Sequence, residues 1–213
     1  MIRTTSNRYG VVVPIRSLET GKSRLLPDSH PLRPQLALAF FLDTISALER
    51  SPFVDRIVVV SKDMTIHRSV RARCEVVADA ESGLAAAVDI GVEELRNGRH
   101  AGPAAVVLPD LPFATADAFD EFFLDAHKHE RAFLADSAGD GTTCVTATST
   151  DLLIHCFGPN SARTHAAIGL VALGVPVPAL RADVDVLTNL CDQQSLKLGA
   201  ETSKVLSRWR IHV

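Results

Sequence analysis

Residues 10–26 read GVVVPIRSLETGKSRLL, an apolar run that breaks into a short basic loop. The run at residues 10–15 is rich in valine and almost wholly apolar, which is typical of a buried strand. The loop that follows contains a glycine and then Lys22, Ser23 and Arg24. Loops that leave a parallel strand in this way bind phosphates in α/β folds, because backbone N–H groups and fixed cations neutralise negative charge. The glycine spacing of a P-loop is missing, and a solvated basic turn also fits this stretch on its own.

Apolar runs of strand length recur along the rest of the chain, with helix-like segments between them. Further strands are expected at residues 56–60, 75–77, 104–108, 132–134, 144–146 and 175–179. Helices are expected at residues 33–50, 82–96 and 116–130. Ser82 and Thr115 are suitable N-caps for the last two helices. This alternation favours one doubly wound α/β domain over residues 1–213, a Rossmann-like arrangement in which helices flank a mostly parallel sheet.

The composition narrows the kind of partner. With 213 residues and a hydrophobic fraction of 46%, the chain can bury the core of one sizeable domain. It has a polar N-terminus and no apolar run of transmembrane length, which predicts a cytoplasmic protein with no membrane partner. The net charge of −3 argues against a general nucleic-acid binder, so we expect a small anionic partner in a pocket. The four cysteines form no CxxC pair, which favours free thiols over a zinc site.

Three aspartates stand where a cation could be held. Asp110, in AAVVLPDLP, follows a predicted buried strand at the edge where open α/β sheets bind ligands. Asp183 and Asp185 alternate in LRADVDVLTNL, so their side chains point the same way on an extended segment. Carboxylates in such positions can hold Mg²⁺, which bridges nucleotide phosphates. The alternatives are a turn in which Asp110 bonds nearby backbone, and capping of a helix near Leu187 by one of the pair.

Two further loops offer groups that suit a phosphate or a carboxylate. The stretch DSAGDGTT ends in Thr143 and has glycines that permit close backbone approach. The stretch FGPNSARTH places Gly158 and Ser161 ahead of an Ala-rich helical run, and Arg163 and His165 could add positive charge. A loop without function and ordinary capping by Ser161 are the alternatives. Because no pair of nucleophile and base stands out, the set favours metal-assisted transfer of a phosphoryl-type group.

Several segments, in this order, resemble the family of guanylyltransferases that act on 2-phospho-L-lactate or phosphoenolpyruvate in the biosynthesis of the deazaflavin coenzyme F420. The matching segments are VPIRSLETGKSRL at 13–25, SGLAAAV at 82–88, VVLPDLPFAT at 106–115, ADSAGDGTT at 135–143, FGPNSARTH at 157–165 and ADVDVLTNL at 182–190. Together they run through nearly the whole chain. The resemblance implies a nucleotidyltransferase fold of the kind found in sugar-nucleotide pyrophosphorylases, with GTP as substrate and Mg²⁺ as cofactor.

The resemblance also implies roles for particular residues. Those that would face the nucleotide are Lys22, Ser23, Arg24, Gly83 and Leu84. Those that would hold the metal are Asp110 together with Asp183 or Asp185. Those that would contact the phosphate and carboxylate of the acceptor are Thr143, Gly158 and Ser161. Lys22, Arg24 and Asp110 form the implied catalytic set.

Two positions bear on the substrates. The family usually has Asn where this chain has Ala85, so a polar contact that bears on guanine selectivity is missing. Thr143 stands where archaeal relatives often have Asn, which resembles the actinobacterial branch and implies phosphoenolpyruvate as the acceptor.

The leading expectation is an enzyme that transfers GMP from GTP to phosphoenolpyruvate. Pyrophosphate would leave, and enolpyruvyl-diphospho-5′-guanosine would form. The transferase that builds the F420 precursor is the expected partner enzyme. One alternative is the same reaction with 2-phospho-L-lactate or 3-phospho-D-glycerate. Another is a catalytically degenerate nucleotide-binding sensor.

Overall fold

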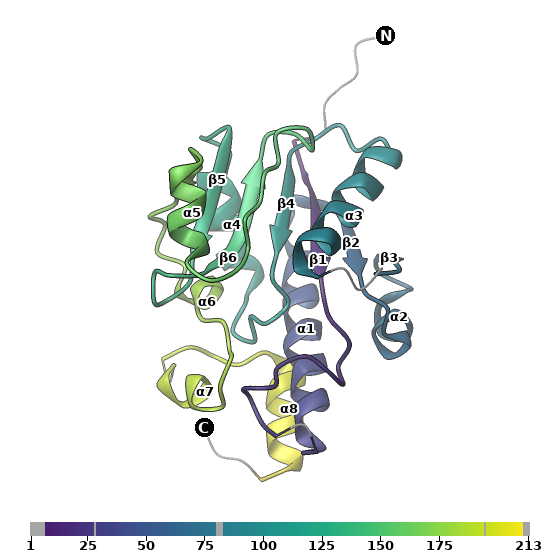
Figure 1. Ribbon diagram of the computed structural model, residues 1–213. Helices are drawn as coiled ribbons and strands as arrows, with labels where there is room; N and C mark the ends of the chain where they lie inside the picture. Colours follow the sequence, from purple (N-terminus) through teal and green to yellow (C-terminus); the bar gives the residue numbers. More distant parts are fainter. Residues whose placement is uncertain (1–6, 28, 80–82, 194, 211–213) are drawn as a thin grey trace.

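A computed structural model describes residues 7–27, 29–79, 83–193 and 195–210. Within them, one sheet contains β1 (Tyr9–Pro14), β2 (Val54–Val60), β3 (Glu75–Val77), β4 (Ala104–Val107), β5 (Arg131–Ala135), β6 (Thr142–Ala147) and β7 (Val171–Ala172). The strand order is β3-β2-β1-β4-β6-β5-β7. Strand β6 runs antiparallel to β4 and β5, and the other neighbouring pairs are parallel. The expected α/β fold with a mostly parallel sheet is confirmed (Figure 1).

Helices cover both faces of this sheet. The described helices are α1 (Leu32–Arg50), α2 (Met64–Val70), α3 (Leu84–Asn97), α4 (Ala116–Ala126), α5 (Ser161–Ala167), α6 (Pro178–Arg181), α7 (Thr188–Asp192) and α8 (Ala200–Arg208). Buried side chains of α1 and α4 share one core cluster, and those of α3 and α5 share another on the opposite face (Figure 1). No helix in the described ranges is both long and apolar enough to cross a lipid bilayer.

The alternation of side chains along β1 explains the two cores. Val11 and Val13 belong to the cluster of α1, and Val12 belongs to the cluster of α3, since successive residues of a strand face opposite ways. Gly91 allows α3 to pack closely on β1, because a Cβ there would lie 2.3 Å from Cγ1 of Val12. The valine run of residues 11–13 is therefore buried on both faces, as its composition predicts.

Most expected elements are present, and the exceptions have physical reasons. The strand expected at residues 175–179 is wrong: the edge strand is β7, and α6 begins at Pro178. Pro176 and Pro178 lack the N–H that a strand donates, and Pro178 occupies the first turn of α6, where proline is tolerated. Thr115 does cap α4, accepting from the N–H of Ala118 at 3.2 Å. Ser82 lies outside the described residues.

The strand order places a crevice at the centre of the sheet. Strand β1 has β2 on one side and β4 on the other, and both pairs are parallel. After β1 the chain continues to β2 on one side, and after β4 it continues to β5 on the other side. Open α/β sheets bind ligands at such a point, beyond the carboxyl ends of the strands. The third core cluster lies beyond this edge and joins α1 to α8. There, Asp43 of α1 accepts from the N–H groups of Glu201 and Thr202, both at 2.9 Å.

Candidate active site

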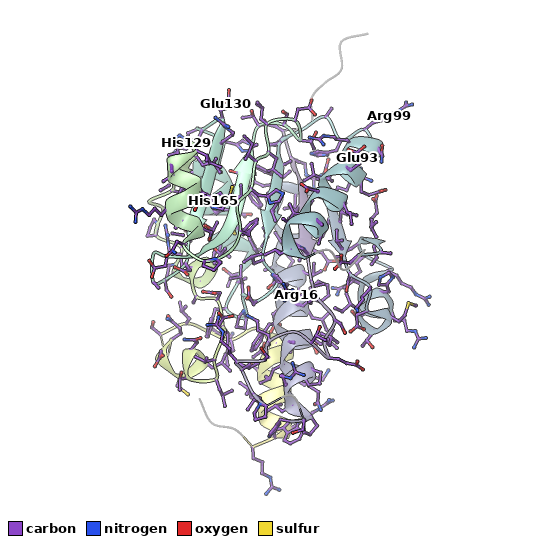
Figure 2. The ribbon with its side chains drawn as sticks, in the orientation of Figure 1. Arg16, Glu93, Arg99, His129, Glu130 and His165 are labelled. Carbon is purple, nitrogen blue, oxygen red and sulfur yellow. The ribbon has the colours of Figure 1, made fainter. Side chains whose placement is uncertain are left out.

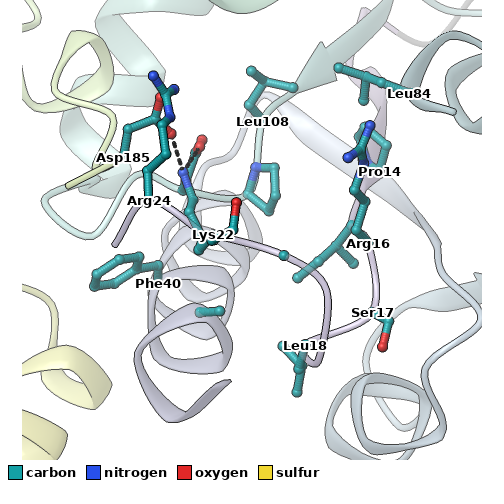
Figure 3. Close-up of a pocket in the computed structure, with 16 residues that line it drawn as sticks. Pro14, Arg16, Ser17, Leu18, Lys22, Arg24, Phe40, Leu84, Leu108 and Asp185 are labelled. Atoms are coloured by element: carbon teal, nitrogen blue, oxygen red, sulfur yellow. Dashed lines mark hydrogen bonds and ion pairs between the residues drawn. The ribbon is translucent and has the colours of Figure 1, made fainter. Parts of the chain in front are cut away.

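A cavity of about 430 Å³ opens beyond the carboxyl ends of β1 and β4 (Figure 3). The loop after β1 forms much of its wall, together with the start of the loop after β4. Ala37 and Phe40 of α1, Leu84 of α3 and Asp185 complete the lining. A second cavity of about 290 Å³ shares Leu84 and the beginning of the β1 loop with the first, and Lys62, Asp79 and Gly83 line its far side. The two cavities therefore form adjoining parts of one site.

Basic and acidic side chains from distant parts of the chain meet in the larger cavity. The ammonium of Lys22 donates to Oδ2 of Asp110 and, at 2.8 Å, to Oδ1 of Asp185. Arg24 pairs with the other oxygen of Asp185. Figure 3 shows these ion pairs on one side of the cavity. The side chains of Lys22 and Asp110 are only 15% and 14% exposed, so this contact is shielded from solvent.

Three carboxylates form the acidic part of the site. One carboxylate oxygen each from Asp110, Asp183 and Asp185 lies within 4.8 Å of the others. Oδ1 of Asp110 is buried and has no hydrogen-bond partner among the described residues. Hard divalent cations prefer oxygen ligands, and a cation would satisfy this oxygen. The donor set therefore fits a divalent metal.

The pKa values show how strongly these charges interact. Burial, together with Asp110 and Asp185, raises the pKa of Asp183 to about 7. Burial alone would also raise the pKa of Asp185, but Lys22 and Arg24 hold it below its usual value. Burial alone would lower the pKa of Lys22, but the two carboxylates raise it above its usual value. Lys22 is therefore a fixed cation, and Asp183 is the carboxylate that a bound cation would help most to ionise.

The local backbone explains how Asp183 and Asp185 reach the site. The N–H of Val184 donates to the carbonyl of Asp110 at 3.1 Å, which ties the two acidic segments together. Oδ1 of Asn189 accepts from the N–H groups of Asp185 and Val186. Helix α7 has no side-chain cap, so neither Asp183 nor Asp185 caps a helix near Leu187. Asp110 likewise uses its carboxylate for Lys22 rather than for the turn backbone.

The residues expected to contact the acceptor are not among the lining residues of either cavity. Thr143 is buried on β6, and its carbonyl accepts from the N–H of Leu108, which does line the cavity. Gly158 and Ser161 flank the start of α5, where the carbonyl of Gly158 accepts from the N–H of Ser161 at 3.1 Å. Ser161 is the first residue of the helix and caps nothing; Asn160 occupies the N-cap position, with no side-chain bond.

His165 does not supply the positive charge expected of it. Its ring is fully buried between α5 and the sheet (Figure 2). Nε2 accepts from the N–H of Cys156 at 2.8 Å, and Nδ1 lies 3.0 Å from the hydroxyl of Thr142. Burial and the neighbouring His155 lower the pKa of His165 to about 4, so the ring is neutral at neutral pH. His165 is thus a packing residue that links the start of β6 to the segment of Cys156.

Three residues of the site were not expected from the sequence. Arg16 lines both cavities, on the side away from Asp185 (Figure 3). Its place in the basic loop was the signal that could have identified it. Asp63 accepts from the N–H of Leu18 at 2.9 Å and also caps α2. Its position before a helix could have indicated the cap, but nothing in the sequence indicated the contact with Leu18. Arg33 bonds the loop backbone, and no local pattern indicates that contact.

Solved structures of low sequence identity share the fold of the chain. No family profile matches the chain. A nucleotidyl transferase from Methanothermobacter superposes with a TM-score of 0.62 at 14% identity, covering 89% of this chain and 97% of that one. The 4-diphosphocytidyl-2C-methyl-D-erythritol synthase from Anaerococcus prevotii gives a TM-score of 0.56 at 10% identity, covering 88% and 97%. At these identities the likeness concerns the fold, and the fold is that of the nucleotidyltransferases.

Relatives of higher identity define the family. The chain is 38% identical over 198 residues to phosphoenolpyruvate guanylyltransferase 2 of Rhodococcus jostii, covering 93% of this chain and 90% of the relative. It is 36% identical over 205 residues to phosphoenolpyruvate guanylyltransferase of Streptomyces coelicolor, covering 94% and 97%. The chain therefore belongs to the phosphoenolpyruvate guanylyltransferase family, which confirms the resemblance found in its sequence.

Proposed function

We propose that the protein transfers GMP from GTP to phosphoenolpyruvate, with residues 1–213 working as one nucleotidyltransferase domain. Support comes from the cavity lined by Lys22, Arg24, Asp110 and Asp185, with Asp183 close to the other two aspartates, in a chain of this family. Such a site can neutralise a triphosphate and hold a divalent cation at the same time.

The reaction forms one bond at phosphorus and breaks another. A phosphate oxygen of phosphoenolpyruvate attacks the α-phosphorus of GTP. The bond from that phosphorus to the oxygen bridging the β-phosphate breaks, and pyrophosphate leaves with the electron pair. The product is enolpyruvyl-diphospho-5′-guanosine. Because the attacking phosphate is already ionised at neutral pH, the step needs no general base, and positioning and charge neutralisation carry the catalysis.

The two cations of the loop would stabilise the charge that develops. We assign Lys22 to the α-phosphate, because its ammonium is buried, fixed and charged at the centre of the site. Arg24, whose side chain is 73% exposed, is assigned to the departing pyrophosphate at the open side. Each would contribute an electrostatic contact that strengthens in the transition state.

Asp110, Asp183 and Asp185 would hold Mg²⁺, the cation that suits carboxylate ligands together with phosphate oxygens. When bound, the ion supplies neutralisation of negative charge on the phosphates. Because Asp183 has a pKa of about 7 without a cation, a proton and the cation compete for it. Binding of the cation is therefore expected to weaken below neutral pH.

The remaining site residues are assigned by their place around the cavities. Ser23 lies between the two loop cations and lines the larger cavity, where it would face the phosphates. Gly83 and Leu84 line the smaller cavity, which would receive the nucleoside. Thr143, whose carbonyl bonds the N–H of Leu108, would contact the acceptor, together with Gly158 and Ser161.

Pyrophosphate release from GTP and Mg²⁺ tests this function. Phosphoenolpyruvate, 2-phospho-L-lactate and 3-phospho-D-glycerate are supplied in parallel, each with and without the transferase that consumes the guanylylated product. Release with phosphoenolpyruvate alone is the expected result. Release with another acceptor alone would replace phosphoenolpyruvate in the reaction. If none of the three acceptors gives pyrophosphate release, although the protein still binds GTP, the result would contradict a transferase and favour a nucleotide sensor.

A further inference from the structure

The backbone of Lys22 has a conformation that needs outside support. Its φ angle is +56°, in the left-handed region that residues other than glycine rarely adopt. The ammonium of the same residue is the cation that reaches Asp110 and Asp185. If the backbone relaxed to the common right-handed or extended regions, the side chain would leave the loop in another direction. The position of the ammonium thus depends on what holds this turn.

Arg33 is the side chain that holds the turn from outside the loop. It lies in the first turn of α1 and is 2% exposed. One amino group of its guanidinium donates to the carbonyl of Gly21, and the other donates to the carbonyl of Glu19. The Gly21 carbonyl belongs to the peptide unit that leads into Lys22, and a planar peptide turns as one body. Arg33 therefore restrains the φ rotation that places Lys22.

The bonds within the loop do not tie it to the core. The N–H groups of Thr20 and Gly21 donate to the carbonyl of Ser17, and the N–H of Leu25 donates to the carbonyl of Lys22. Asp63 fixes the beginning of the loop, where its carboxylate accepts from the N–H of Leu18. Arg33 acts on the later half, and it connects that half to a long helix packed on the core.

We infer that Arg33 is a positioning residue: its guanidinium holds the backbone of residues 19–22 so that the Lys22 ammonium stays between Asp110 and Asp185, ready for the nucleotide phosphates. The part that concerns the nucleotide rests on the proposed function. Arg33 itself touches no reacting group. The planar fork of the guanidinium spans two carbonyls at once, which a lysine ammonium on the same helix position does not reproduce.

The first test compares Arg33→Lys with Arg50→Lys, an exposed arginine at the other end of α1 whose side chain bonds Ser46. Thermal unfolding first establishes that each variant is folded. We expect Arg33→Lys to lower kcat/KM for GTP by about 10- to 100-fold while KM for phosphoenolpyruvate changes by less than about threefold. Arg50→Lys should leave all of these constants unchanged. Wild-type constants in Arg33→Lys would overturn the inference.

A double variant separates positioning from a merely structural role. If Arg33 acts through Lys22, its effect disappears once the ammonium is gone, because energies of residues that act as one unit do not add. Adding Arg33→Lys to Lys22→Ala should therefore change kcat/KM by less than about threefold beyond Lys22→Ala alone. Multiplicative losses in the double variant would show that Arg33 does not work through Lys22.

Hydrogen exchange decides the same point without any reaction. Amides of residues 17–25 should exchange at least about tenfold faster in Arg33→Lys than in the wild type, because restrained backbone exchanges slowly. The control Arg50→Lys should match the wild type. Equal exchange in the two variants would overturn the inference. If the wild type releases no pyrophosphate from GTP, the proposed function fails. The exchange experiment still tests whether Arg33 restrains the loop, because it does not depend on the reaction.

Discussion

Asp110 pairs one carboxylate oxygen with Lys22, and its other oxygen is buried without a partner in the described structure. Asp110→Asn keeps the shape of the side chain and removes its charge. We expect turnover to fall by about 10²-fold or more, the scale of losing a preorganised electrostatic contact, while the protein stays folded. Steady-state pyrophosphate release and thermal unfolding measure the two effects. Asp117→Asn, at an exposed position on α4, is the matched control. Normal turnover in Asp110→Asn would remove Asp110 from the mechanism.

His165 should make the stability of the fold depend on pH. Burial and His155 lower its pKa to about 4, whereas an unfolded histidine titrates near 6.5, so the unfolded chain binds the proton first. The stabilising contribution is complete above about pH 6.5 and is lost as the pH falls toward 4. Between pH 7 and pH 5 this amounts to about 2 kcal/mol in the free energy of unfolding. Urea denaturation at both pH values measures it, and His165→Gln should show a smaller difference. An equal difference in the variant would contradict the assignment.

At the scale of elements, Asp63 connects helix α2 to the loop after β1. One carboxylate oxygen caps α2 by accepting from the N–H of Thr65 at 2.8 Å, and the other accepts from the N–H of Leu18. Burial alone would raise the pKa of Asp63, but these backbone N–H groups hold it below its usual value. Asp63→Ala should therefore lower the free energy of unfolding by about 1–2 kcal/mol and also raise KM for GTP several-fold.

A second cap provides the control for that prediction. Thr115 caps α4 through the N–H of Ala118, and it lines neither cavity of the candidate site. Thr115→Ala should cost a similar amount of stability, about 1 kcal/mol, and leave KM for GTP unchanged. If both variants shift KM equally, general destabilisation explains the effect, and the link between Asp63 and the loop has no functional part.

At the scale of the whole molecule, ligand binding should stabilise the fold. A ligand that binds only the folded state adds about 2.7 kcal/mol at 100 times its Kd. If GTP and Mg²⁺ both bind in the cavity lined by Lys22, Asp110 and Asp185, as proposed, the two together should raise the unfolding temperature more than either does alone. Differential scanning fluorimetry with GTP, with Mg²⁺ and with both measures this. No shift in any of the three would show that the cavity binds no nucleotide.

Local patterns predicted much of the fold, because they reflect the burial of single elements. The valine-rich runs became strands β1, β2 and β4, and the helix expected at residues 33–50 differs from α1 by one residue at its start. The prediction failed at residues 175–179, where apolar character outweighed two prolines that exclude regular pairing. Hydrophobicity shows that a segment is buried, but hydrogen-bonding capacity decides whether it can be a strand.

The sequence by itself determined the α/β class, the basic loop after the first strand, the three aspartates and, through its ordered segments, the family. Only the tertiary structure decided which charges meet. Lys22 contacts Asp110 across 88 positions of the chain and Asp185 across 163, because β4 lies beside β1 and the N–H of Val184 bonds the carbonyl of Asp110. It also decided that Arg33 supports the loop and that His165 is neutral. Periodicity is a local property, whereas strand order, side-chain pairing and burial arise only when distant segments pack together.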